Sequence, residues 1–171
     1  LLLPLFEELE LRWRNQFGAQ AERVFFYSWL RSKLGARLYH NNRQYNGASL
    51  LLINVSDLPM APGLWLTAWL ASSAGCPVEV FDWPLPPTEL ALAVEHIQPR
   101  AVLLYSSQAL NSTHLQRLLG GYDCPCLLVG QVVQIHAEEL VAITAQNAEL
   151  SLAADPLAAL HSLTDLNLLH S

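Results

Sequence analysis

The segment Ser49-Leu50-Leu51-Leu52-Ile53-Asn54-Val55 decides the fold. Its apolar side chains do not alternate with polar ones, which is typical of a strand that is buried on both faces of a sheet. An apolar helix is predicted next, over residues 63–73, and Gly75 ends it. Because parallel strands need a long crossover, a buried strand followed at once by a helix indicates an α/β domain.

The same strand–helix alternation continues to the end of the chain. Further strands are predicted over residues 78–81, 101–105, 126–129 and 149–152, and helices over residues 88–97, 112–119, 137–143 and 156–163. Thr88, Asn111 or Ser112, and Asp155 before Pro156 are the expected helix-start residues. We therefore predict a flavodoxin-like, doubly wound, five-stranded parallel sheet over residues 47–171.

Residues 1–46 form a separate helical segment. Apolar residues recur at helical spacing up to a break at Gly18, and a second helix is expected from about Val24 to Leu38. Asn41, Asn42, Asn46 and Gly47 predict a turn-rich linker. The expected organisation is a small N-terminal helical bundle (1–46) followed by the α/β domain (47–171).

Composition excludes several classes of function. Hydrophobic residues make up 52% of the chain and charged residues 14%, so the apolar excess must enter a core or an interface with another chain. A net charge of −6 disfavours direct binding of nucleic acid by this segment. No apolar run reaches the roughly 18 residues of a membrane helix, and Leu1-Leu2-Leu3-Pro4 does not resemble a signal peptide. The three cysteines cannot all pair, which favours reduced thiols and a cytoplasmic protein.

The chain carries no motif of a catalytic or metal centre. Gly-x-Ser-x-Gly, P-loop and Gly-x-Gly-x-x-Gly patterns are missing. His96, His114 and His136 are scattered, and no carboxylate–histidine pair recurs with metal-ligand spacing. His136 is expected at a helix start. We predict a protein without enzymatic activity and without a metal site.

Two motifs resemble those of cobalamin-binding modules, found in methyltransferases and in light-sensing MerR-type regulators. The bundle motif of that family is a Pro-Leu start, a Trp, and a Glu-His pair about ten residues later. Here Pro4-Leu5 and Trp13 match, and Glu22-Arg23 puts arginine in place of the histidine. The resemblance covers nearly the whole chain and implies the predicted order of bundle and α/β domain.

The second motif is the family's Asp-x-His-x-x-Gly after the first strand, whose histidine ligates cobalt from below. With Gly63 as the family glycine, Leu58 stands at the aspartate and Met60 at the histidine, while Asp57 is one residue out of place. A thioether is a poor ligand for Co(III), and a leucine cannot orient an imidazole. The resemblance therefore implies that histidine-ligated cobalamin binding has been lost. We expect no bound cofactor, although cobalamin is possible.

The run Gly63-Leu64-Trp65-Leu66-Thr67-Ala68-Trp69-Leu70-Ala71-Ser72 is similar to the MerR-like curli and biofilm regulators of enteric bacteria. This resemblance implies an effector and oligomerisation domain, forming a homodimer or homo-oligomer, with a winged helix-turn-helix upstream that binds DNA. A small-molecule effector is possible. The alternatives are a genuine cobalamin sensor, base-on or without a protein ligand, and, less favoured, a corrinoid methyltransferase component.

A candidate ligand pocket follows from the fold and the resemblance together. A doubly wound sheet binds ligands outside the carboxyl ends of its strands. The candidate residues are Trp13, Arg23, Tyr27, Asp57, Met60, Trp65, Ser107, Gly130 and Gln131. Trp65 and Trp69 are interpreted as core packing, as a wall of the pocket, or as rings that block the slot for the cofactor tail. Trp13, Arg23 and Tyr27 form either a lid over a ligand or a bundle core.

Overall fold

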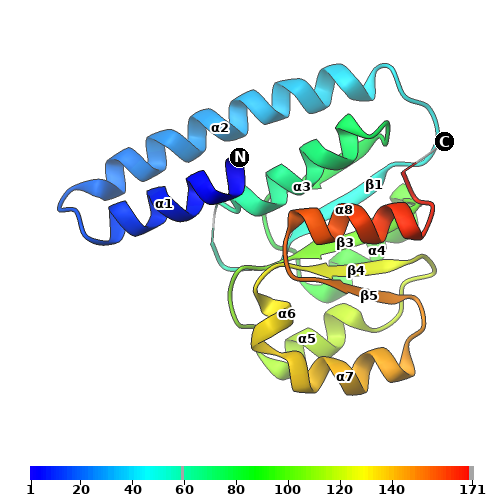
Figure 1. Ribbon diagram of the computed structural model, residues 1–171. Helices are drawn as coiled ribbons and strands as arrows, with labels where there is room; N and C mark the ends of the chain where they lie inside the picture. Colours follow the sequence, from blue (N-terminus) through cyan, green and yellow to red (C-terminus); the bar gives the residue numbers. More distant parts are fainter. Residues whose placement is uncertain (59, 170–171) are drawn as a thin grey trace.

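The computed structural model describes residues 1–58 and 60–169. Five strands form one fully parallel sheet in the order β2-β1-β3-β4-β5 (Figure 1). The strands are β1 (Leu50–Asn54), β2 (Val78–Phe81), β3 (Ala101–Tyr105), β4 (Cys126–Val129) and β5 (Leu150–Ala153). This order confirms the predicted flavodoxin-like, doubly wound sheet.

Burial explains why the central strands have no polar alternation. Every residue of β1, β3 and β4 is buried, whereas the edge strands β2 and β5 are partly accessible. Leu52 of β1 pairs with Val80 of β2 on one side and with Leu103 of β3 on the other. Side chains of successive residues enter opposite cores, so each face of the sheet needs its own helical layer.

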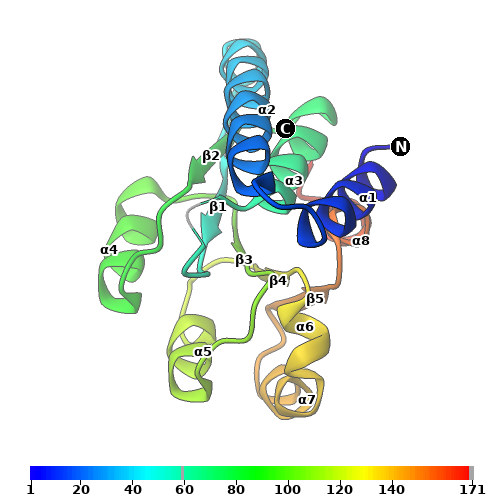
Figure 2. The ribbon, with the colours of Figure 1, turned by 90° about the vertical axis from the view of Figure 1, so that its left-hand side faces the viewer.

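Two helical layers cover the sheet (Figures 1 and 2). One core packs α3 (Pro62–Ser73) and α8 (Pro156–Asp165) against the sheet through residues such as Leu64 and Leu163. The other core uses α4 (Pro87–Ile97), α5 (Ser112–Leu119) and α7 (Ala137–Gln146), with the short α6 (Val132–Ile135) leading into α7. Much of the apolar excess of the composition therefore fills these two cores.

The N-terminal segment is a pair of helices, α1 (Leu2–Arg14) and α2 (Ala19–Asn42). Gly18 lies between them with φ of +77°, in a left-handed conformation that glycine adopts readily. Helix α2 packs on α3, with Gly35 opposite the Trp65 ring, and it extends beyond the α/β domain together with α1 (Figure 1).

The linker prediction was wrong for Asn41 and Asn42, which belong to the last turn of α2. The Asn42 amide donates to the carbonyl oxygen of Val78 at 2.7 Å and accepts from its N–H at 3.0 Å. Asn41 donates to the Ser72 hydroxyl at 3.0 Å. These side chains extend the helix because tertiary partners replace the turn hydrogen bonds that asparagine otherwise forms.

The expected helix starts are confirmed at two of three positions. The side chains of Asn111 and Asp155 accept hydrogen bonds from the N–H groups of Thr113 and Ala158. Thr88 lies inside the first turn of α4, and Pro86 occupies the position before that helix. Proline suits a first turn because its fixed φ costs no hydrogen bond there, so Pro87 takes the start instead. Within the described residues, no helix is both long and apolar enough to cross a membrane.

Candidate functional site

The reversal of strand order lies between β1 and β3, where a doubly wound sheet places its ligands. Asn54, fully buried at the end of β1, fixes the backbone at this point. Its amide nitrogen donates to the carbonyl oxygens of Leu58 at 2.8 Å and Asp82 at 3.0 Å. Its oxygen accepts from the N–H and the hydroxyl of Ser56. One side chain thus joins the ends of β1 and β2 and closes the loop toward α3.

A second close approach joins the ends of β3 and β4. Gly130 has φ of +109°, and a Cβ atom built on it would lie 2.2 Å from the carbonyl oxygen of Ser106. The Ser106 hydroxyl hydrogen-bonds the backbone of Gln108, and the Ser106 carbonyl accepts from the N–H of Val132. The loops therefore touch each other through backbone atoms, and only glycine fits at position 130.

Tyr105, the last residue of β3, fills the space beside the first turn of α3. A Cβ atom on Gly63 would lie 1.9 Å from the Tyr105 hydroxyl oxygen and within 3 Å of two ring carbons. The ring is 8% exposed, and this burial raises the pKa of Tyr105 to about 12. A neutral tyrosine therefore occupies the position beside the glycine that the resemblance singled out.

The α1–α2 pair forms an aromatic cluster around an acidic residue. The Tyr27 hydroxyl donates to Glu10 Oε1, and the Arg23 guanidinium reaches the same oxygen at 3.1 Å. Burial, followed by the contact with Glu10, raises the pKa of Tyr27. Trp13 is buried, with ring contacts to Phe26 and Tyr27, and its Nε1 has no hydrogen-bond partner among the described residues. Arg23 is thus neutralised by Glu10, which weakens its candidacy as an anion ligand.

The space between this cluster and the α/β domain is almost closed. A cavity of about 10 Å³ lies between α2 and the segment before α3, and its lining includes Tyr27, Leu30, Met60 and Trp65. That volume accommodates about one water molecule. The structure therefore brings three of the predicted pocket residues together, but around a space far smaller than a drug-sized ligand requires.

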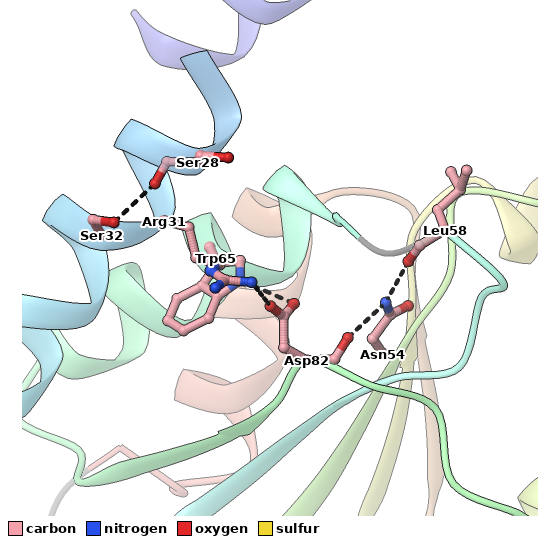
Figure 3. A network of polar contacts seen from close by, with 7 residues as sticks. All are labelled: Ser28, Arg31, Ser32, Asn54, Leu58, Trp65 and Asp82. Atoms are coloured by element: carbon pink, nitrogen blue, oxygen red, sulfur yellow. Dashed lines mark hydrogen bonds and ion pairs between the residues drawn. The ribbon is translucent and has the colours of Figure 1, made fainter. Parts of the chain in front are cut away.

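Trp65 connects the helical pair to the sheet through Asp82 (Figure 3). Its indole N–H donates to Asp82 Oδ1 at 3.1 Å, and Arg31 of α2 donates to Oδ2 at 2.8 Å. Trp65 also packs against the clusters on both sides of it. Asp82 therefore orients the ring and holds α2 over the end of β2.

We expect Asp82→Ala to lower the free energy of unfolding by about 1 kcal/mol, because it removes an ion pair and the acceptor of a half-buried indole N–H. Asp82→Asn keeps an acceptor for Trp65 but loses the charge, so it should cost less. Urea unfolding followed by tryptophan fluorescence measures both. An Asn variant as unstable as the Ala variant would show that the ion pair, and not the indole bond, is the stabilising contact.

The remaining predicted residues lie apart from this small cavity. Asp57 and Gln131 are exposed and Ser107 is half-buried. Gly130 allows the close backbone approach to Ser106 described above. Sequence reasoning did not single out Asn54, Asp82, Tyr105 or Glu10. A polar residue that ends a fully apolar strand was the available signal for Asn54. Asp82 and Glu10 had none, since their partners lie far along the chain.

The described residues offer no group of His, Cys, Asp or Glu that could hold a metal ion. His136 directly precedes α7; its Nε2 accepts from the N–H of Leu110 at 3.0 Å and its Nδ1 lies 3.2 Å from Glu139. All three cysteines are free, and burial raises the pKa of each thiol. Protonated thiols are poor nucleophiles and poor metal ligands at neutral pH.

A larger groove of about 770 Å³ opens at the amino ends of the strands, between α4 and the segment before β4. Its lining includes Leu92, Glu95 and Tyr122. Because it lies at the amino ends of β3 and β4, it is remote from the reversal point where this fold class binds ligands.

Comparison with known proteins establishes the fold. No protein-family model matches the chain, and no curated protein does. Among solved structures, the methanol:cobalamin methyltransferase complex MtaBC from Methanosarcina barkeri is similar, with a TM-score of 0.56 and 13% identity. The likeness covers 72% of this chain and 47% of the other, so this chain spans about half the length of that protein. It confirms the predicted fold, an α/β sheet domain shared with a cobalamin methyltransferase complex.

The residues present do not fit a cobalamin whose cobalt is bound by a protein histidine. Met60 occupies the expected position of that histidine, and it lies against the aromatic cluster of the helical pair. Tyr105 takes up the space beside Gly63, and its side chain supplies the three atoms nearest to a Cβ added there. Trp65 and Trp69 pack against the buried cluster of α1 and α2, as the core-packing interpretation expects, and the ring beside Gly63 is Tyr105, which sequence reasoning did not consider.

Proposed function

We propose that this chain is the effector and oligomerisation domain of a MerR-type transcription regulator that no longer binds cobalamin through histidine. It has no catalytic role of its own and works in the cytoplasm. In this proposal, DNA is bound by a winged helix-turn-helix in the same polypeptide. The support for the regulator comes from the run 63–72 and the order of helical pair and sheet domain.

The observation that carries the loss of cobalamin is the combination of Met60 with the Tyr105 ring against Gly63. Either change alone would still permit binding. Without the histidine, a cobalamin could bind with no protein ligand on cobalt; without the space beside Gly63, a histidine could still bind a corrinoid that lacks the nucleotide tail. Together they remove the lower ligand and the space beside the glycine. The cavity of about 10 Å³ under α2 points the same way.

The test is dark incubation of the purified chain with adenosylcobalamin or methylcobalamin, followed by desalting and an absorbance spectrum. We expect a colourless protein. Retention of nearly one cofactor per chain would contradict the loss and favour the alternative, a cobalamin sensor without a histidine ligand. That alternative has its own support, because the similar methyltransferase complex is named for cobalamin.

A matched pair of variants tests which of the two changes prevents cobalamin binding. Tyr105→Ser opens the space beside Gly63, and Met60→His restores a nitrogen ligand. We expect neither single variant to retain colour as well as the double variant. Circular dichroism checks that each variant is folded. The regulator role is tested separately: a full-length gene product without an upstream helix-turn-helix would contradict it.

A further inference from the structure

Helix α2 has a second apolar face, opposite the one that packs on α3. Tyr27, Leu30, Leu34 and Leu38 are buried on the inner face. On the outer face, Phe25 is 74% exposed, Trp29 50% and Tyr39 70%. Three large aromatic rings in water on one helix are unusual for a monomeric protein, and such patches mark interaction sites.

These rings follow a coiled-coil pattern. Together with the exposed small residues Ser32 and Ala36, they occupy positions 25, 29, 32, 36 and 39, with spacings of 4, 3, 4 and 3. That is the a/d repeat by which two helices pack along a seam. We call these five residues the α2 stripe; it spans about 21 Å along the helix. Figures 1 and 2 show α2 along the outside of the molecule, away from the sheet.

We infer that the α2 stripe is a self-association surface, on which α2 of a second copy packs antiparallel. Antiparallel pairing about a twofold axis between residues 30 and 31 sets Phe25 against the partner's Ala36, and Trp29 against the partner's Ser32. Phe25 and Trp29 thus each face a small residue, which is how facing helix positions fill space without voids. A parallel pair would instead stack identical rings and leave gaps at residues 32 and 36.

Charge is compatible with this pairing. The same register places Tyr39 opposite the partner's Glu22, whose carboxylate can accept its phenolic O–H. Glu22 is exposed, and Arg12 approaches it only to 3.9 Å. The residues that flank the stripe along its length carry a single formal charge, that of Lys33, with histidine counted as neutral: Phe26, Ser28, Lys33, Gly35 and His40. Arg31 points to Asp82 instead.

The area of the stripe suits a reversible dimer. Aromatic side chains bury roughly 150–250 Å² each, so these exposed fractions give about 400 Å² per copy and about 800 Å² for two. Flanking side chains bring the total to roughly 1,000 Å², the lower limit of a biological interface. We therefore expect a dissociation constant in the micromolar range. The inference rests on the proposed role of the chain as an oligomerising domain, and it assigns the surface.

Cysteine cross-linking of the full chain tests both the surface and the direction. In the antiparallel register the two Ser32 Cα atoms lie about 6 Å apart, within reach of a disulfide, whereas the two Ala36 Cα atoms are separated by more than about 16 Å along the seam. We expect Ser32→Cys to form a disulfide dimer under mild oxidation and Ala36→Cys not to. The background is a Cys124→Ser chain, since Cys124 is the least buried native thiol.

Analytical ultracentrifugation supplies the second readout. Phe25→Glu should shift the chain to monomer, while Arg37→Glu, exposed on α2 but outside the stripe, should leave it dimeric. Cross-linking of both cysteine variants would indicate parallel helices and overturn the inference, as would a monomeric parent chain or a dimer that Phe25→Glu leaves intact. None of these outcomes changes the cobalamin test, so the two proposals fail independently.

Discussion

Gly130→Ala is expected to destabilise the fold by about 3 kcal/mol or more, a large loss for the addition of a single methyl group. Two costs add at this position. The backbone has φ of +109°, which an L side chain rarely adopts, and the new Cβ would meet the Ser106 carbonyl oxygen at 2.2 Å. Because that oxygen belongs to the backbone between β3 and α5, it cannot move without disturbing the sheet.

Two further glycine variants separate these costs. Gly121 has a similar φ of +96° with nothing within 4 Å of its Cβ position, so Gly121→Ala measures the strain alone, about 1 kcal/mol. In Gly63→Ala the three nearest atoms to the new methyl group belong to the movable Tyr105 ring, and a second change, Tyr105→Ala, should relieve this clash. Chemical denaturation compares the three. Equal losses for Gly121→Ala and Gly130→Ala would show that the contact with Ser106 is not a close one.

Asn54→Leu should cost about 3 kcal/mol, although leucine matches the apolar character of the strand. The change leaves the N–H and hydroxyl of Ser56 and the carbonyl oxygens of Leu58 and Asp82 without their partner. Buried polar groups without partners are costly because they have lost water as well. Thermal and urea unfolding measure the loss, and Asn111→Ala, at an exposed helix start, is a reference of about 1 kcal/mol.

Asn54→Asp gives the same prediction a pH dependence. A carboxylate there keeps the acceptor for Ser56 but faces two carbonyl oxygens, so the folded state should raise the pKa of the introduced carboxyl group above its unfolded value. A raised pKa means that stability is present below the unfolded pKa and is lost as the pH rises through the folded one. The loss of stability of this variant relative to the parent chain should therefore be smaller at acid pH than at neutral pH. A pH-independent difference would contradict the assigned hydrogen bonds.

Much of the fold was predictable because its signals are local. The apolar runs at Leu50, Ala101 and Cys126 need two covering layers, and Asn111 and Asp155 hydrogen-bond to N–H groups two or three residues away. Thr88 was misplaced because a proline pair competes for the same helix start. Asn41 and Asn42 were misplaced because their partners, Ser72 and Val78, are more than 30 residues distant.

The candidate site was less predictable, since its contacts join segments that are far apart. Composition and motif spacing indicated a sheet domain that lacks the cobalt-binding histidine, and Met60 carries that information without any structure. Nothing in the sequence indicates that Tyr105 packs against Gly63, 42 positions earlier, or that Asp82 joins Trp65 to Arg31. These contacts depend on which strands neighbour each other and on how α2 lies.

By itself, then, the sequence determined the alternation of buried strands and helices, the glycine positions and the missing histidine, because each depends on the chemistry of neighbouring residues. Only the tertiary structure decided that the space beside Gly63 is filled and that Arg23 is neutralised by Glu10. It also decided that one face of α2 is left in water. The physical reason is that filling, neutralisation and exposure are properties of the packed arrangement, in which strand order and helix placement bring distant side chains together.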